Sequence, residues 1–175
     1  VRSLASAKGL GGWARVQPGE RRPPRAPVPF GEYIPFRKYL DWIPPLSLVP
    51  RDMVRGTQQQ VFTTNKNEIK ISPVISFEGS FDRYIRRSVV QGAEVVVILT
   101  NQASYGESGM SDQFILMSRA NAISNNRDIA HAAITGKSAF ISGIDGDIYS
   151  STGLFVDAVL TDEIKTSNKL TLYTR

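Results

Sequence analysis

The feature that most constrains the fold is an alternation of strand-like and helix-like segments between residues 68 and 134. Apolar runs typical of buried strands lie at residues 68–75, 94–100 and 129–134. Two segments with helical periodicity, residues 82–91 and about 111–124, separate these runs. Strands that alternate with helices of this length favour a sheet with parallel strands. The sequence therefore predicts an α/β protein.

Shorter elements are expected on both sides of this unit. Residues 61–64 read as a strand that turns into the first apolar run, and residues 138–142 and 148–150 read as a hairpin around Asp145-Gly146. Residues 157–164 form a last strand-like stretch, and residues 36–42 a short helix that ends before Pro44-Pro45. The helix at 111–124 is expected to begin with Ser111 or Asp112 as its cap. Its apolar positions are Phe114, Met117 and Ala120 on one face, with Leu116 and Ile123 beside it.

The charge of the chain is concentrated at its beginning. Residues 1–29 carry six lysines and arginines and one glutamate, which accounts for the whole net charge of +5. Basic segments can bind nucleic acids or anionic lipids. The irregular, proline-rich composition instead favours an unstructured leader without a partner, and we expect no nucleic-acid binding. The sequence is thus divided into a basic tail, residues 1–26, and a folded part, residues 27–175.

Whole classes of chemistry are excluded by composition. The chain contains no cysteine, which rules out disulfides, thiolate metal sites and a thiol nucleophile. It contains one histidine, His131, in an apolar strand-like stretch, where a structural role is favoured over that of a base or ligand. No apolar run reaches the roughly 18–20 residues that span a bilayer. We expect neither a metal nor a cofactor.

The tripeptide Ser76-Phe77-Glu78 stands where the first apolar run meets the first helix. A residue at a strand-to-helix turn is pushed out of the sheet with its side chain exposed, which suits a nucleophile. Without cysteine, any nucleophile at this turn would be a hydroxyl group. A serine that merely fills the turn is the simpler interpretation of the same pattern.

Several further blocks surround the tripeptide in a fixed order. They are Val-Pro-Phe-Gly-Glu-Tyr-Ile-Pro at 28–35, Phe81-Asp82, Gln91-Gly92-Ala93, Leu-Thr-Asn-Gln-Ala at 99–103, Met-Ser-Arg-Ala at 117–120, Thr-Gly-Lys-Ser-Ala at 135–139, Asp145-Gly146 and Thr-Gly-Leu-Phe at 152–155. With these blocks the chain resembles the carbon–nitrogen hydrolase (nitrilase-superfamily) domain of the apolipoprotein N-acyltransferases, of an actinobacterial type. The resemblance covers about 145 residues.

The resemblance implies a four-layer α-β-β-α sandwich, here truncated at its N-terminus. It also implies a location on the outer face of the cytoplasmic membrane, carried in full-length relatives by a membrane-spanning part. The implied activity moves an acyl chain from a phospholipid to the N-terminal amine of a diacylglyceryl-cysteine lipoprotein. The implied partners are therefore the phospholipid donor and the lipoprotein N-terminus, and a homo-oligomer is a further expectation.

Only some of the catalytic residues of the family have a matching residue in this sequence. The nucleophilic cysteine falls on Ser76, the supporting glutamates fall on Glu32 and Glu78, and Phe77 is a substrate-binding candidate. The lysine that stabilises the oxyanion falls on Pro24, and the general-base glutamate falls upstream of the chain. A serine hydroxyl depends on an adjacent base, and loss of one oxyanion donor costs about 10²–10³ in rate. We therefore expect a degenerate homologue or fragment with little acyltransferase activity alone.

Two other functions are compatible with the same residues. One is a non-catalytic binding or assembly module with a nitrilase-type fold, and the other is a soluble carbon–nitrogen hydrolase that acts on amides. In a non-catalytic chain, Glu32 and Glu78 would be paired with arginines such as Arg119, since buried carboxylates must be paired or protonated.

Overall fold

The computed structural model describes residues 4–8, 33–40, 42, 61–64 and 67–175. These residues belong to two compact units, residues 16–58 and the remainder of the chain. Within the first unit, helix α1 (Arg37–Leu40) forms a single turn inside the segment predicted as a short helix. Residues 46–60, predicted as a loop, lie outside the described residues, as do Pro24 and Glu32.

The second unit is built on a six-stranded sheet with the order β2-β3-β4-β5-β6-β7. Its strands are β2 (Phe62–Thr63), β3 (Lys70–Ile75), β4 (Val95–Asn101), β5 (Ile129–Ile134), β6 (Ala139–Ile141) and β7 (Ile148–Ser151). Strands β3, β4 and β5 are parallel, whereas β2 pairs antiparallel to β3, and β6 and β7 continue antiparallel from β5. The α/β fold, the parallel central strands and the closing hairpin predicted from the sequence are confirmed.

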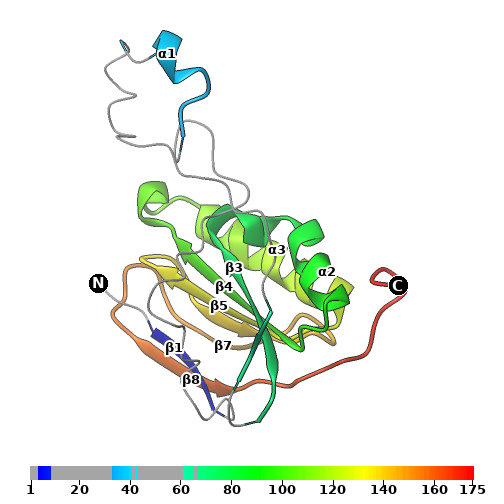
Figure 1. The fold of residues 1–175 in the computed structure, drawn as a ribbon. Helices are drawn as coiled ribbons and strands as arrows, with labels where there is room; N and C mark the ends of the chain where they lie inside the picture. The colour runs from blue at the N-terminus through cyan, green and yellow to red at the C-terminus, as the bar shows by residue number, and fades with distance from the viewer. Residues whose placement is uncertain (1–3, 9–32, 41, 43–60, 65–66) are drawn as a thin grey trace. The chain divides into compact units, whose positions relative to one another are not determined.

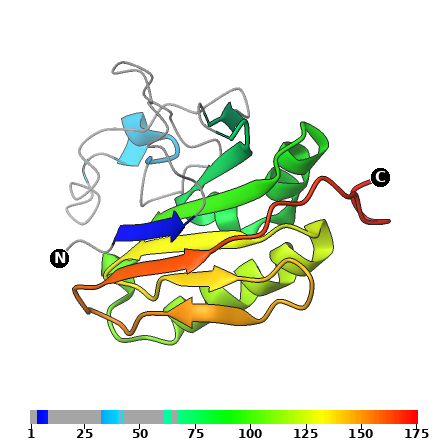
Figure 2. The same ribbon diagram turned by 90° about the horizontal axis from the view of Figure 1, so that it is seen from below.

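Helices α2 (Asp82–Val90) and α3 (Met110–Asn125) cover one face of this sheet (Figure 1). A two-stranded parallel sheet of β1 (Leu4–Lys8) and β8 (Val159–Glu163) lies on the opposite face, next to β5 (Figure 2). The unit thus has one helical layer, the large sheet and a small second sheet. A second helical layer of the predicted sandwich is not among the described residues of this unit.

Strand β1 was not expected, because the sequence of its segment is short, mixed in polarity and followed by a proline-rich stretch. Its pairing with β8 spans five residues, from Leu4 opposite Val159 to Lys8 opposite Glu163. The partner strand lies about 155 residues further along the chain, so no local sequence pattern predicts the pairing of the two strands. Residues 9–26 of the predicted tail lie outside the described residues.

The core lies between the large sheet and the two helices. It is a cluster of aliphatic side chains from β3, α2, β4, α3, β5 and β6: Val74, Ile85, Val89, Val96, Ile98, Ile115, Ala122, Ile129, Ala139 and Ile141. Burial of such side chains stabilises a fold by roughly 1.5–3 kcal/mol each. This packing fixes the carboxyl ends of β3, β4 and β5 next to one another at one edge of the sheet.

Helix α3 turns a different face to the core than its apolar pattern predicted. Met117, Leu116 and Ile123 are exposed by 39%, 57% and 46%. The buried positions follow the helical period but are largely polar: Ser111, Phe114, Ile115, Ser118, Asn121, Ala122 and Asn125. The predicted face is therefore right at Phe114 and wrong at Met117 and Ala120. Hydrogen bonds from polar residues of the helix to β5, to the loop after β4 and to the turn after β3, and not apolar contact alone, hold it in place.

The predicted cap of α3 was also wrong. The residue at the cap position is Gly109, and no side chain caps the helix. The hydroxyl of Ser111 instead donates to Gln102 Oε1 over 2.6 Å and accepts the backbone N–H of Lys137 over 2.9 Å. The carboxylate of Asp112 pairs with the ammonium group of Lys137. Both side chains are thus committed to tertiary contacts.

The amino ends of the parallel strands are fastened by two adjacent charged residues. The guanidinium group of Arg127, which is 1% exposed, donates to the carbonyl oxygens of Ala93, Asn126 and Lys169 over 2.6, 2.8 and 2.7 Å. Burial lowers the pKa of Arg127, and the nearby Glu94 carboxylate opposes this shift. The carboxylate of Asp128 accepts the backbone N–H groups of Gly143 and Lys165, each over 2.8 Å. We call this pair the amino-edge clamp, because it ties residues 165–169 to the sheet.

Candidate active site

Ser76 lies at the carboxyl end of β3, at the turn predicted from the sequence. The strand ends at Ile75, and Ser76 opens the 3₁₀ turn η2 (Ser76–Ser80), which runs into α2. The φ angle of Ser76 is +52°, in the left-handed region that residues other than glycine adopt only at a cost of about 1–2 kcal/mol. Such strain persists where the surrounding packing enforces it, and it is common at functional sites.

Packing against β4 and α3 enforces the turn. A Cβ atom at Gly79 would lie 2.8 Å from Cγ2 of the buried Ile98, so only glycine allows η2 to approach β4 so closely. The side-chain amide of Asn121 donates to the carbonyl oxygen of Gly79 over 2.9 Å. The geometry at Ser76 is therefore set by contacts from two elements that lie far from it in the sequence.

Aromatic side chains gather beside this turn. The ring of Phe77 meets the ring of Phe81 edge-on with centroids 5.1 Å apart, and the ring of Phe114 at 6.3 Å. Tyr105, from the loop after β4, stacks on Phe114 at 5.7 Å. Phe77, the substrate-binding candidate, thus belongs to an apolar wall next to Ser76. A wall of this kind suits a substrate with an apolar part.

Glu78 is 5% exposed within the same turn as Ser76. The structure thus brings two of the candidate catalytic residues, Ser76 and Glu78, into one turn. The pairing expected between Glu78 and Arg119 is wrong: Arg119 Nε donates to the carbonyl oxygen of Gly146 over 2.6 Å, and its guanidinium group lies 4.0 Å from Asp147. Arg119 therefore fastens the turn of the β6–β7 hairpin.

Gln102 is a buried polar residue of this edge that the sequence did not single out. It follows β4 directly and is 2% exposed. It packs closely on Gly136: a Cβ atom at position 136 would lie 2.1 Å from Oε1 of Gln102. Its Oε1 atom accepts the hydroxyl of Ser111, whereas its Nε2 atom has no hydrogen-bond partner among the described residues. A polar residue at the carboxyl end of a buried strand could have drawn attention to this position.

His131, for which the sequence favoured a structural role, lies between the sheet and α3. It is fully buried in β5, and its Nδ1 atom lies 2.9 Å from the hydroxyl oxygen of Ser118 on α3. Burial lowers its pKa from 6.5 to about 4, so the ring is neutral at pH 7. No hydrogen bond joins the ring to Ser76, and its Nε2 atom is buried without a hydrogen-bond partner among the described residues.

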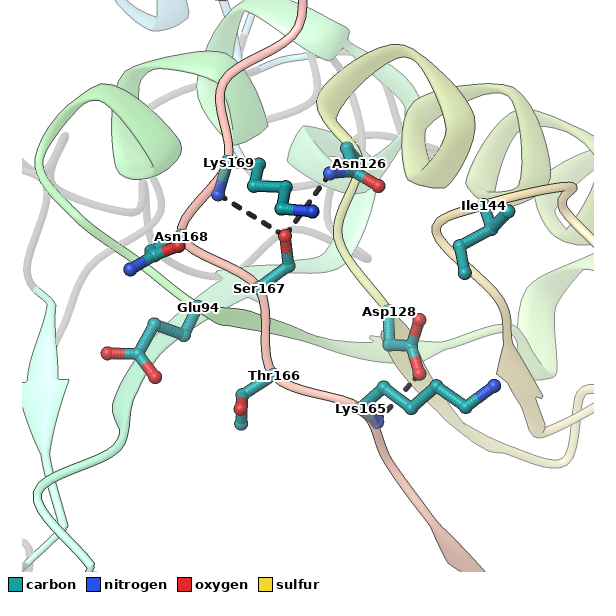
Figure 3. Close-up of a pocket in the computed structure, with 9 residues that line it drawn as sticks. All are labelled: Glu94, Asn126, Asp128, Ile144, Lys165, Thr166, Ser167, Asn168 and Lys169. Atoms are coloured by element: carbon teal, nitrogen blue, oxygen red, sulfur yellow. Dashed lines mark hydrogen bonds between the residues drawn. The ribbon is translucent and has the colours of Figure 1, made fainter.

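A pocket of about 490 Å³ lies at the opposite, amino edge of the sheet, beside the amino-edge clamp. Figure 3 shows Ser167 bonded to Asn126 and to the backbone of Lys169, and Asp128 bonded to the backbone of Lys165. These contacts fasten the chain itself, and the pocket lies away from Ser76. Among the described residues, no group of three or more His, Asp or Glu side chains could hold a metal ion. The described helices include none that is both long and apolar enough to cross a bilayer.

Comparison with solved structures identifies the class of fold. A cysteine-to-serine mutant of the Nesterenkonia AN1 amidase from the nitrilase superfamily matches 69% of this chain and 46% of its own, with a TM-score of 0.50 and 19% identity. The cysteine-to-alanine mutant of the same amidase matches 61% of this chain and 42% of its own, also with a TM-score of 0.50 and 19% identity. The fold is that of the nitrilase superfamily.

Comparison with curated protein sequences narrows the assignment from a class of fold to one family. The apolipoprotein N-acyltransferase of Haemophilus ducreyi is 32% identical over 149 residues, and that of Geobacter metallireducens 34% over 148 residues. The enzyme of the same name from Mycolicibacterium smegmatis is 32% identical over 158 residues, which are 90% of this chain. The chain is a homologue of the apolipoprotein N-acyltransferases and spans 26–29% of the length of these three relatives. No family model matches it.

Proposed function

We propose that this chain forms part of the carbon–nitrogen hydrolase domain of an apolipoprotein N-acyltransferase homologue in which Ser76 occupies the position of the nucleophile. The reaction of this family would transfer an acyl chain from a phospholipid to the N-terminal amine of a diacylglyceryl-cysteine lipoprotein, at the outer face of the cytoplasmic membrane. The observation that carries the proposal is the strained turn at Ser76, which stands beside an apolar wall at the carboxyl edge of the sheet.

We further propose that the chain alone has little acyltransferase activity. A thiol with a pKa of about 8.5 is a few per cent ionised at neutral pH and is intrinsically nucleophilic, whereas a serine hydroxyl needs an adjacent base. The histidine of the chain is buried against Ser118 and stays neutral. Glu78 is the nearest carboxylate in sequence, and in this proposal it supports the turn and does not take the proton of Ser76.

The proposal is tested by giving the turn the nucleophile it lacks. Because the chain has no cysteine, Ser76→Cys introduces a single thiol, and Ser104→Cys in the exposed loop after β4 supplies a matched control. Each variant is incubated with phospholipid in mixed micelles and weighed by intact-protein mass spectrometry. Attack of the thiolate on the ester carbonyl forms a thioester and releases lysophospholipid, so the protein gains the mass of one acyl group.

We expect the acyl adduct on Ser76→Cys and none on Ser104→Cys. We also expect the unmodified chain to transfer no more acyl group to a diacylglyceryl-cysteine lipopeptide than Ser76→Ala does. Absence of the adduct on a folded Ser76→Cys variant would contradict the assignment of the nucleophile position. Acyl transfer by the unmodified chain that disappears in Ser76→Ala would contradict the low activity.

The outer face of α3 favours a second candidate function, an assembly module. Leu116, Met117 and Ile123 leave an apolar stripe exposed on this helix, as expected for a surface that pairs with a second copy. Sedimentation velocity tests this candidate: a dimer that dissociates in a Leu116→Glu variant would support it, and a monomer at all concentrations would exclude it.

A further inference from the structure

The pocket at the amino edge of the sheet has the size of a small-molecule site. Its volume of about 490 Å³ lies within the range of pockets that hold such ligands. All nine lining residues are described by the structure, and they come from the residue before β4, the connection between α3 and β5, the β6–β7 hairpin and the segment after β8. The amino-edge clamp ties this last segment to the sheet, so that wall of the pocket is held in place.

The segment after β8 presents a repeating set of side chains. Lys165, Ser167 and Lys169 occupy alternate positions in a stretch that forms neither helix nor turn. In extended chain, side chains two residues apart lie on the same side. Figure 3 shows the side chains of Lys165 and Lys169 on the side of the segment that faces Ile144, whereas Glu94 lies on the other side. Two ammonium groups and a hydroxyl group between them thus border the pocket.

The two ammonium groups have no carboxylate partner within ion-pair distance. Among the described residues, neither Lys165 nor Lys169 forms an ion pair, and Nζ of Lys165 lies 5.7 Å from the ring centre of Tyr149. The buried carboxylate of the pocket, Asp128, already accepts the backbone N–H groups of Gly143 and Lys165. The pocket therefore offers positive charge that the chain itself leaves unpaired.

Ser167 adds a hydrogen-bond donor between the two lysines. Its hydroxyl oxygen accepts the side-chain amide of Asn126 over 3.2 Å, the backbone N–H of Lys169 over 3.3 Å and the guanidinium group of Arg127 over 3.4 Å. Since three donors point at this oxygen, its own hydrogen must point away from them, and that hydrogen has no acceptor among the described residues. A hydroxyl group held in this way can donate to an oxygen atom of a ligand.

The negative charge of this edge is directed at Arg127. The carboxyl end of α3 carries a partial negative charge, which by itself would repel an anion. Arg127 Nη1, however, donates to the carbonyl oxygens of Asn125 and Asn126 over 3.3 and 2.8 Å. The carboxylate of Glu94 interacts with the same guanidinium group, which is why it opposes the lowering of the pKa of Arg127 by burial. The two lysines therefore remain available to a ligand.

We propose that this pocket binds a small organic molecule through a phosphate group. The ammonium groups of Lys165 and Lys169 and the hydroxyl group of Ser167 contact the phosphate oxygens, and the organic part of the ligand lies against Ile144. A phosphate monoester carries a charge of about −1.5 to −2 and three acceptor oxygens, which suits two ammonium groups and one hydroxyl group. A carboxylate fits less well, because its planar pair of oxygens matches the fork of an arginine better than two point charges. The pocket and Ser76 lie at opposite edges of the sheet, so this inference does not rest on the proposed function.

The test is an NMR titration of the isotope-labelled full chain with glycerol phosphate. Inorganic phosphate is titrated separately, and succinate serves as an organic anion without a phosphate group. We expect the backbone amides of residues 165–169 to shift until the site is saturated, with tighter binding of glycerol phosphate than of the other two anions. The basic residues within 1–29 are a second source of anion binding, and the position of the shifted amides separates the two sources.

A double variant removes both ammonium groups at exposed positions. An exposed ion pair changes affinity a few-fold, so Lys165→Gln/Lys169→Gln should bind glycerol phosphate about tenfold more weakly. Lys137→Gln/Arg83→Gln is the matched control, because it removes two positive charges near the carboxyl edge of the sheet. Its affinity should stay within about twofold of that of the unmodified chain, since charges so far from the pocket are screened.

Asp145 allows the sign of the charge effect to be tested. This exposed carboxyl group has a lowered pKa, first through the hydroxyl of Ser142 and the backbone N–H of Asp147, and to a smaller extent through the ammonium group of Lys165. Asp145→Asn removes a carboxylate that competes with the ligand for Lys165. We expect this variant to bind glycerol phosphate about twofold more tightly.

The inference is overturned if neither phosphate probe shifts the amides of residues 165–169, or if Lys165→Gln/Lys169→Gln binds as tightly as the unmodified chain. Equally tight binding of succinate would contradict recognition of a phosphate group, and equally tight binding of inorganic phosphate would contradict the contact with Ile144. Weaker binding by Asp145→Asn would contradict the role given to the charge of Lys165. None of these measurements involves acyl transfer, so failure here would leave the proposed function standing.

Discussion

Replacement of Arg127 by methionine removes the positive half of the amino-edge clamp while keeping most of the side-chain volume. The guanidinium group donates to the carbonyl oxygens of Ala93, Asn126 and Lys169 over 2.6–2.8 Å. A hydrogen bond to a charged group stabilises a fold by about 1.5–3 kcal/mol, so three such bonds contribute roughly 4–9 kcal/mol before desolvation. The variant leaves these three oxygens without their donor.

Desolvation of the buried guanidinium group opposes this gain by several kcal/mol, which is the origin of its lowered pKa. We therefore expect Arg127→Met to lower the free energy of unfolding by about 3 kcal/mol, a large fraction of the stability of a typical domain. Arg127→Lys keeps the charge but loses the planar group of donors, so its free energy of unfolding should lie between those of the unmodified chain and Arg127→Met.

The free energy of unfolding is measured by urea titration followed by circular dichroism. Arg87→Met, at an exposed position on α2, is the matched control and should change the free energy by less than about 0.5 kcal/mol. Hydrogen exchange supplies a local readout: the backbone amide of Lys165, bonded to Asp128, should exchange faster in Arg127→Met. A loss below about 1 kcal/mol, or unchanged exchange at Lys165, would refute the reasoning that the clamp holds this segment to the sheet.

Three further predictions concern other buried contacts. The pKa of His131 is about 4 in the fold and about 6.5 in the unfolded chain, so the unfolded state binds the proton first as the pH falls. The contribution of the neutral ring to stability is complete above pH 6.5, and we expect the free energy of unfolding to decrease by about 2 kcal/mol between pH 7 and pH 5. Urea titration at both pH values should show this decrease in the unmodified chain and not in His131→Gln. Gly143→Ala would place a Cβ atom 2.5 Å from backbone atoms of Arg127, so we expect the thermal unfolding midpoint to fall by several degrees. Asn121→Leu leaves the carbonyl oxygen of Gly79 without its donor, which should cost about 1–3 kcal/mol and, in the Ser76→Cys background, change the rate of thiol alkylation.

Each of these predictions has an outcome that would contradict it. If the free energy of unfolding depends on pH equally in the unmodified chain and in His131→Gln, the loss of stability at low pH comes from carboxylates and not from His131. An unchanged thermal unfolding midpoint in Gly143→Ala would mean that the backbone at Arg127 can move aside without loss of stability. Unaltered alkylation in Asn121→Leu would show that the turn keeps its geometry without the contact from α3.

The central part of the fold could be predicted from the sequence because its pattern is local. Apolar runs at β3, β4 and β5 alternate with segments of helical length, and Asp145-Gly146 provides a recognisable turn. Ser76 could be located because it stands between a strand and a helix. Its left-handed conformation could not be predicted, since a serine is not a residue that usually adopts a positive φ angle.

The remaining features depend on partners distant in sequence. The partner of Gln102 is Ser111, that of Ser118 is His131, and β1 finds its partner at the other end of the chain. A hydroxyl or amide in a helix looks the same in the sequence whether it faces water or a strand. Periodicity of apolar residues therefore predicted the existence and length of α3 but not its orientation.

The orientation of α3 has a consequence for how the chain folds. The side chains of Leu116, Met117 and Ile123, which an apolar pattern alone would bury, face outward. Directional bonds such as that of Asn121 to the carbonyl oxygen of Gly79 instead select the face that packs inward. Native and locally favoured arrangements thus conflict at this helix, which is the condition called frustration.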